Sequence, residues 1–259
     1  MRTIYKICLL AVFSMGCLVG QAQRKNIIVS DDLSANSEIL KVKMGAAWYG
    51  KIMKFDFGDY KIEKSKMGWT STNQKSNLFN TKTESKSKNK FTFHLSNKTS
   101  DTAIVNAMTN ILTKEIHSFE LFPNFYLGSD ELLSESHFFS SFITLSSNKE
   151  EVWELLIENT YGSEVHYKYE AFLKNDERII NIIPISSNRD GNDKRKFPAL
   201  GYEFIENERS LCAVQYFGGG AFGLNKNIVW LKSDLESKMK LILAAAMTSL
   251  MEFKLQEVE

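Results

Sequence analysis

Residues 217–224, FGGGAFGL, carry the spacing that most resembles a known chemical motif. Gly218, Gly220 and Gly223 match the G-x-G-x-x-G pattern with which dinucleotide-binding proteins approach a pyrophosphate. That chemistry requires a helix opening at the last glycine, because the helix N-terminus supplies the amides that bind phosphate. The last glycine is instead followed by a polar linker and the β-branched, aromatic run IVWL at 228–231. The pattern therefore predicts a loop between two strands and not a nucleotide site.

A different function for the glycine loop stays open. Glycine permits positive φ and close approach of the backbone, and two phenylalanines flank the run. We expect a loop that rims a binding surface. Its candidate ligand-binding residues are Phe217, Gly218, Gly219, Gly220 and Phe222.

The densest group of acid–base residues lies in 129–137, SDELLSESH. Its carboxylates and histidine could form an acid–base pair or hold a metal, and the alternative is a solvated helical turn between strands. The chain's 4 histidines are widely separated and show neither H-x-H nor H-E-x-x-H spacing. Glu135 and His137 are therefore weak catalytic candidates, and we expect neither a metal site nor a cofactor.

Other catalytic patterns are not found in the sequence. There is no G-x-S-x-G, and Cys212 lies within an apolar run, where cysteine is normally an inert hydrophobic residue. The stretch 188–193, NRDGND, misplaces the turn glycine of a calcium loop and has Ala199 where the closing glutamate belongs.

The N-terminus has the layout of a secretory signal peptide. Arg2 and Lys6 supply positive charge, residues 7–19 form an apolar run, and Gly20 and Ala22 are small residues before a cleavage point. We expect residues 1–22 to be removed and the protein to be exported, as a periplasmic, cell-surface or secreted protein. Cys17 offers a competing possibility, a lipid anchor.

The charge balance bears on the partners. Loss of Arg2 and Lys6 from the 32 basic residues leaves 30 against 31 acidic ones. A chain so close to neutral lacks the basic excess that binds a phosphate backbone, so we expect no nucleic-acid partner. We also expect no transmembrane segment in the mature chain, because no second run approaches the required length.

Period-two alternation dominates the mature chain and predicts strands, for example in KIMKFDF at 51–57 and YKYEAFL at 167–173. Residues 23–37 are expected to be a loosely packed leader, and 38–259 a single β-rich domain. Residues 70–90 and 186–196 are so rich in Lys, Ser, Thr, Asn and Asp that we expect solvated loops there.

One strong helix is predicted near the C-terminus, at about 234–253. Ser233 and Glu236 have the spacing of a capping box, and apolar residues then recur at steps of three and four. The fold class is therefore α+β and β-rich, a mostly antiparallel sheet (sandwich or open barrel) with a C-terminal helix packed on it. This outline is similar to that of the open barrels with a helical lid found in periplasmic lipoprotein carriers, at the level of fold alone.

Two functions fit these observations. The 18 Phe and 9 Tyr, without a catalytic constellation, favour an exported non-catalytic binding module for an apolar ligand or an envelope protein. The alternative is an exported hydrolase whose site is assembled from dispersed residues, including Glu135 and His137.

Overall fold

The computed structural model describes residues 26–47, 50–77, 81–98, 101–122, 125–127, 129–188, 197–219 and 226–257. The predicted signal peptide at 1–22 and the possible lipid anchor at Cys17 lie outside these ranges.

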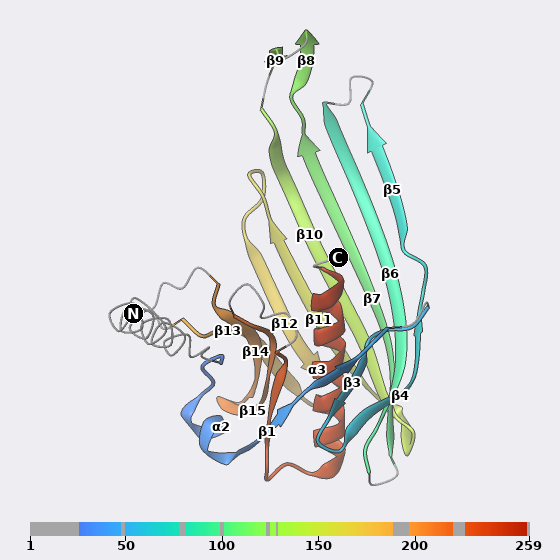
Figure 1. Ribbon diagram of the computed structural model, residues 1–259, viewed down its shortest axis with the longest axis vertical. Coiled ribbons are helices and arrows are strands. Elements are labelled where there is room, and N and C mark those ends of the chain that lie inside the picture. Colours follow the sequence, from blue (N-terminus) through green and yellow to red (C-terminus); the bar gives the residue numbers. More distant parts are fainter. Residues whose placement is uncertain are drawn as a thin grey trace, which may run out of the picture.

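Most of the described residues belong to one strongly curved antiparallel sheet (Figure 1). Its strand order is β1-β16-β15-β14-β13-β12-β11-β10-β7-β6-β4-β3-β2, and β5 pairs with β6 beyond the end of β4. β8 (Phe119–Phe122) and β9 (Phe125–Leu127) pair separately. The strands of the sheet are β1 (Ser37–Lys41), β2 (Lys43–Gly45), β3 (Lys54–Phe57), β4 (Tyr60–Met67), β5 (Ser71–Ser76), β6 (Lys82–Ser96), β7 (Thr102–Ile116), β10 (Glu131–Leu145), β11 (Asn148–Tyr161), β12 (Lys168–Lys174), β13 (Ile179–Ser186), β14 (Ala199–Glu206), β15 (Arg209–Gly218) and β16 (Ile228–Lys232).

The two ends of this strand order are joined by the chain itself. β1 and β2 stand at opposite ends of the order, yet only Val42 separates them in sequence. The Val42 amide donates to the Asn227 carbonyl at 3.1 Å, and its side chain is buried. Because the chain passes directly from one edge of the sheet to the other, the sheet forms a nearly closed barrel. The predicted β-rich α+β fold is confirmed, in its barrel form.

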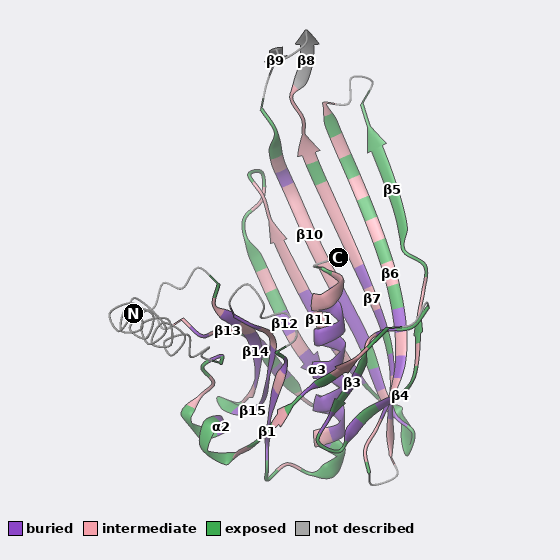
Figure 2. Ribbon diagram, viewed as in Figure 1, coloured by how far each residue is buried: buried purple, intermediate pink, exposed green. Residues whose placement is uncertain are grey.

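Helix α3 (Ser237–Gln256) packs against the concave side of the sheet, and every residue from 241 to 253 is buried (Figure 2). Apart from Thr248, Ser249 and Glu252 these residues are all apolar, and a helix with so little polar surface needs cover on all sides. The rings of Phe253 and Phe139 stack with centroids 4.5 Å apart. The hydroxyls of Thr248 and Ser249 donate to helix carbonyls one turn earlier, at 2.8 and 3.0 Å, so these polar groups are satisfied inside the core.

The predicted capping box does not form. Helix α3 begins at Ser237, and its N-cap Glu236 makes no side-chain capping bond. The other box residues have tertiary partners: the Ser233 amide donates to the Asn36 carbonyl at 3.0 Å, and Asp234 pairs with Arg209. Contacts with distant strands therefore replace the local cap.

The polar stretch at 70–90 is not a loop over most of its length. It contains β5 and the first half of β6, which continue the ladder beyond the apolar core. Strand pairing satisfies the backbone whatever the side chains are, and β7 supplies a partner for every residue of β6. Residues 78–80 lie outside the described ranges, as do 189–196 of the second predicted loop.

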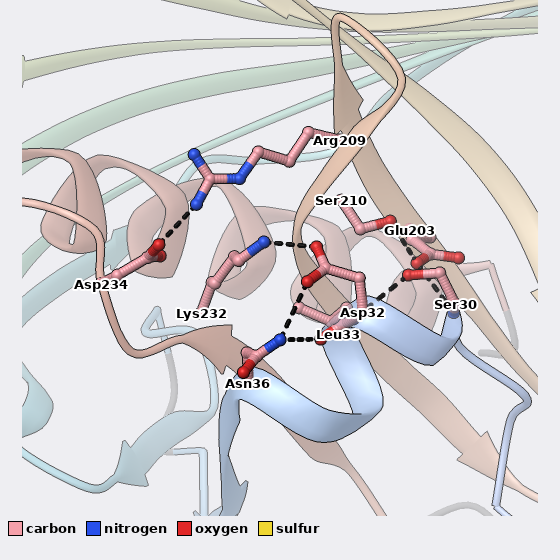
Figure 3. Close-up of polar contacts among 9 residues, drawn as sticks. All are labelled: Ser30, Asp32, Leu33, Asn36, Glu203, Arg209, Ser210, Lys232 and Asp234. Carbon is pink, nitrogen blue, oxygen red and sulfur yellow. Dashed lines mark hydrogen bonds and ion pairs between the residues drawn. The ribbon is translucent and has the colours of Figure 1, made fainter.

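The segment expected to be a loose leader is anchored by two buried residues, Ile27 and Leu33, while most of its other described residues are exposed. Leu33, in helix α2 (Asp31–Asn36), is fully buried with Ile27, Ala199, Ala213 and Trp230. Buried polar side chains also hold this segment: Gln215 accepts from the Ile27 amide at 2.9 Å. Glu203 accepts from the Ser30 amide, and Lys232 pairs with Asp32 (Figure 3). Few apolar residues are needed when strands far along the chain supply the contacts.

Leu33→Ala tests this packing. Because the side chain is 0% exposed, we expect a loss of about 2–5 kcal/mol in the free energy of unfolding, measured by urea denaturation. Ile39→Ala is the matched control, since Ile39 is 59% exposed and its truncation should cost within about 0.5 kcal/mol. Equal, small losses in both variants would show that the N-terminal segment is not part of the core.

Candidate functional site

The glycine loop joins two strands, as predicted. β15 ends at Gly218 and β16 begins at Ile228, while α3 does not begin until Ser237. Among the residues described after the loop, from 226 onward, no helix N-terminus therefore lies close enough to cradle a pyrophosphate.

The described part of the loop serves backbone packing. Gly218 is buried opposite Ala199, and Phe217 is half-buried opposite Leu200. Gly219 has φ +72°, and a Cβ there would lie 3.0 Å from the Ala199 nitrogen, so glycine is required at this position. Gly220 and Phe222 lie outside the described residues. A ligand-binding role for this loop stays a prediction.

Glu135 and His137 lie on strand β10 and not on a helical turn. Two residues apart on a strand, they face the same side of the sheet, toward the C-terminal end of α3. One imidazole nitrogen of His137 contacts a Glu135 carboxylate oxygen, and the other lies 3.0 Å from Glu257, which follows α3. The Tyr161 hydroxyl, from β11, donates to Glu135 at 2.7 Å. The structure thus gathers both weak candidates with two residues that sequence reasoning missed.

The surrounding charges favour the protonated histidine. The hydrogen bond to Glu257 raises the pKa of His137, burial opposes that rise, and the bond to Glu135 adds to it. Burial acts to raise the pKa of Glu257, but the hydrogen bond from His137 and the charge of Lys254 lower it overall. Burial and the bond to Glu135 raise the pKa of Tyr161 to about 12.

A histidine in this setting cannot act as a general base without losing a partner. Both ring nitrogens of His137 donate to carboxylates when the ring is protonated, so no lone pair is left to accept a substrate proton. The arrangement ties the end of α3 to β10. Among the described residues no group of three or more His, Cys, Asp or Glu side chains could hold a metal ion. Cys212 is fully buried, and burial raises the pKa of its thiol, which disfavours the reactive thiolate.

A pocket of about 110 Å³ opens beside this cluster, between the end of α3 and strands β6 and β7. Asn89 and Thr109 are directly opposite in the β6–β7 register, and both line it. Thr109 is only 6% exposed, and its hydroxyl has no hydrogen-bond partner. Buried polar groups are normally satisfied, so an unpaired hydroxyl buried in the wall of a pocket is unusual and has capacity left for a bond to a ligand or water atom. The lining residues are Thr70, Ser87, Asn89, Thr109, Ile111, Phe253, Gln256 and Glu257.

The polar lining continues along β6 beyond the pocket. Thr83, Ser85, Ser87 and Asn89 are half-buried and alternate with exposed residues. Thr72 of β5 donates to Ser87 at 3.3 Å, and Asn89 donates to Gln256 at 2.9 Å. The sequence KTESKSKNK at 82–90 holds the signal that could have revealed this face, because its Ser, Thr and Asn recur with a period of two.

A second and larger hollow, of about 650 Å³, is lined by residues of α2, β1, the start of β15, β16 and the link before α3, and its charged side chains are paired with one another. Its lysine Lys232 pairs with Asp32, and Arg209 pairs with Asp234 (Figure 3). These charges neutralise each other, and the Lys232–Asp32 pair fastens the N-terminal segment to the barrel.

Comparisons of the chain with protein-family models, with curated proteins and with solved structures found no match. Within the described ranges, no helix has both the length and the apolar character needed to cross a membrane.

The His137 cluster predicts a pH dependence of stability. A raised folded-state pKa contributes stability that is fully present below the ordinary value of about 6.5 and is lost as the pH rises through the folded value. We expect the free energy of unfolding to fall as the pH rises from about 6 through the raised folded-state pKa of His137, and to fall less in His137→Gln. Urea denaturation across this range measures it. Parallel pH profiles, or an imidazole pKa by NMR at or below the ordinary value, would contradict the cluster.

Proposed function

We propose that this protein is an exported, non-catalytic binding module whose ligand is a neutral, hydroxyl-rich molecule such as an oligosaccharide. The unpaired hydroxyl of Thr109, buried in the wall of the pocket at the end of α3, is the observation that carries the proposal.

The lining chemistry favours a neutral ligand. Thr70, Ser87, Asn89, Thr109 and Gln256 offer hydroxyls and amides, which both donate and accept as sugar hydroxyls do. The one charged side chain in the lining, Glu257, already contacts His137 and Lys254. Ile111 and Phe253 add an apolar wall for the C–H face of a ring.

The size and setting of the pocket favour an elongated ligand. The volume of about 110 Å³ suits one end of such a molecule. Beyond it, β6 and β7 extend past the C-terminal end of α3 (Figure 1), and their inward positions include Ser85 opposite Thr113. A linear oligosaccharide could follow this row of hydroxyls.

The core argues against an apolar ligand between sheet and helix. Phe91, Phe93, Leu243 and Met247 are all at most 1% exposed and already fill that space. The alternative function, a hydrolase using Glu135 and His137, needs a ring nitrogen that is open to substrate, and both nitrogens here face carboxylates.

Thr109→Val tests the pocket, because valine keeps the shape and removes the hydroxyl. The wild-type protein is first screened on an array of neutral oligosaccharides, and the strongest binder is titrated by calorimetry. We expect the variant to bind about 10-fold more weakly and to be at least as stable as the wild type, since the buried hydroxyl has no partner to lose.

Thr92→Val is the matched control, because Thr92 lies on the opposite face of β6. It should leave the affinity unchanged. Absence of binding to every neutral glycan, or equal affinity in the two variants, would refute the proposed ligand site.

Export is tested by the denatured intact mass of the protein purified from its own cells. We expect a chain that starts at Gln23, because Gly20 and Ala22 have the spacing of a cleavage site. A chain starting at Cys17 with added acyl mass would show a lipid anchor instead, and an uncut chain starting at Met1 would contradict processing.

A further inference from the structure

The outer face of β6 is a row of charged side chains. Lys82, Glu84, Lys86, Lys88 and Lys90 are exposed, while the residues between them are half-buried, as the alternating bands of Figure 2 show. The same period of two that places hydroxyls inside the barrel therefore places lysines outside it.

Neighbouring strands widen this row in register. Lys75 of β5 and Lys114 of β7 are both opposite Glu84, and Lys66 of β4 is opposite Thr92. We consider the paired residues 64–67 of β4, 71–76 of β5, 82–94 of β6 and 104–116 of β7. Among the side chains of these ranges that face outward, Glu84 is the one acidic residue. None of these lysines forms an ion pair with another described residue. We call this surface the lysine face: Lys64, Lys66, Lys75, Lys82, Lys86, Lys88, Lys90 and Lys114.

Such a face is unexpected in a chain whose formal net charge is only +1. Alternate residues of a strand lie about 7 Å apart, so Lys86, Lys88 and Lys90 repel one another. Lysines on edge strands prevent sheets from aggregating, which accounts for Lys75 on β5. It does not account for β6, because β7 pairs along one side of it, and β5 and β4 pair along the other. The concentration of charge instead fits an anionic partner.

Trp69 indicates what kind of anionic partner. It is 86% exposed and lies in the link between β4 and β5. Its neighbours in sequence are fixed to the lysine face: the Gly68 amide donates to the Lys90 carbonyl at 2.7 Å, and Ser71 pairs with Lys88. Exposed tryptophan beside lysine is typical of surfaces that rest in the headgroup region of a bilayer.

We propose that the lysine face and Trp69 dock this protein on a membrane surface that carries anionic headgroups. Lysine is a compact point charge on a flexible stem and suits a fluid layer of phosphates better than a fixed bidentate partner. Docking through the outer face leaves the Thr109 pocket, on the inner face of the same strands, open to its ligand. This inference does not depend on the proposed function.

Vesicle co-sedimentation tests the docking, with phosphatidylcholine vesicles compared to mixed phosphatidylcholine–phosphatidylglycerol vesicles. The wild-type protein should bind only the anionic vesicles, and less at high salt. The triple variant Lys86→Glu, Lys88→Glu, Lys90→Glu should bind on the order of 100-fold more weakly or worse. The triple variant Lys86→Gln, Lys88→Gln, Lys90→Gln removes the positive charges without adding negative ones, so it is less prone to a folding defect. It should also bind the anionic vesicles more weakly than the wild type.

The control variant Lys41→Glu, Lys149→Glu, Lys226→Glu makes the same charge change at exposed positions outside the lysine face, and should keep most of the binding. Addition of anionic vesicles should shift tryptophan emission to the blue in the wild type and not in Trp69→Phe. Equal binding to both vesicle types, equal losses in the two glutamate variants, or binding to soluble polyglutamate but not to vesicles would overturn the proposal.

Discussion

Burial of one helix on every side is the constraint on which the rest of this structure depends. From residue 241 to 253, α3 has no exposed face, so packing against a flat sheet would leave half of its apolar surface in water. The sheet must therefore curve around the helix. Consecutive antiparallel strands provide this curvature, because each can be joined to the next by a short turn and twisted relative to it. Val42 completes the enclosure by carrying the chain from one edge to the other.

The end of the helix divides the barrel into two chemically different halves. Along β6 the inward residues change from Leu95, Phe93 and Phe91 to Asn89 and Ser87 at the level where α3 ends. Thr109 and Phe253 meet at this boundary, in the pocket. The contact between His137 and Glu257 lies there as well, and it ties the helix terminus to the wall. Inside the barrel, the protein's own side chains fill the half that surrounds the helix. The polar half is therefore where a ligand has room inside the barrel.

Strand pairing lets the polar half exist without a hydrophobic core of its own. β5 and the first half of β6 contain almost no apolar side chains, and the ladder to β7 satisfies their backbone. Freed from packing, the two faces of these strands can carry different chemistry. Hydroxyls and amides line the inside, and lysines cover the outside.

The sequence by itself determined the class of fold, the strand–loop–strand arrangement around Gly218 and the existence of the C-terminal helix. Each of these follows from local patterns: a period of two, glycine between two β-branched runs, and apolar steps of three and four. Polarity misled the prediction at 70–90, and the sequence did not indicate that Leu33 anchors the N-terminal segment, because pairing with β7 and burial of Leu33 both depend on distant partners. The sequence indicated only part of the candidate site, namely Glu135 and His137, because these two residues lie close together on one strand. Glu257 lies 120 residues from His137, and Thr109 lies opposite Asn89 on a neighbouring strand. Only the tertiary structure decided that these groups meet, because the pairing of β6 with β7 and the packing of α3 inside the curved sheet bring them together.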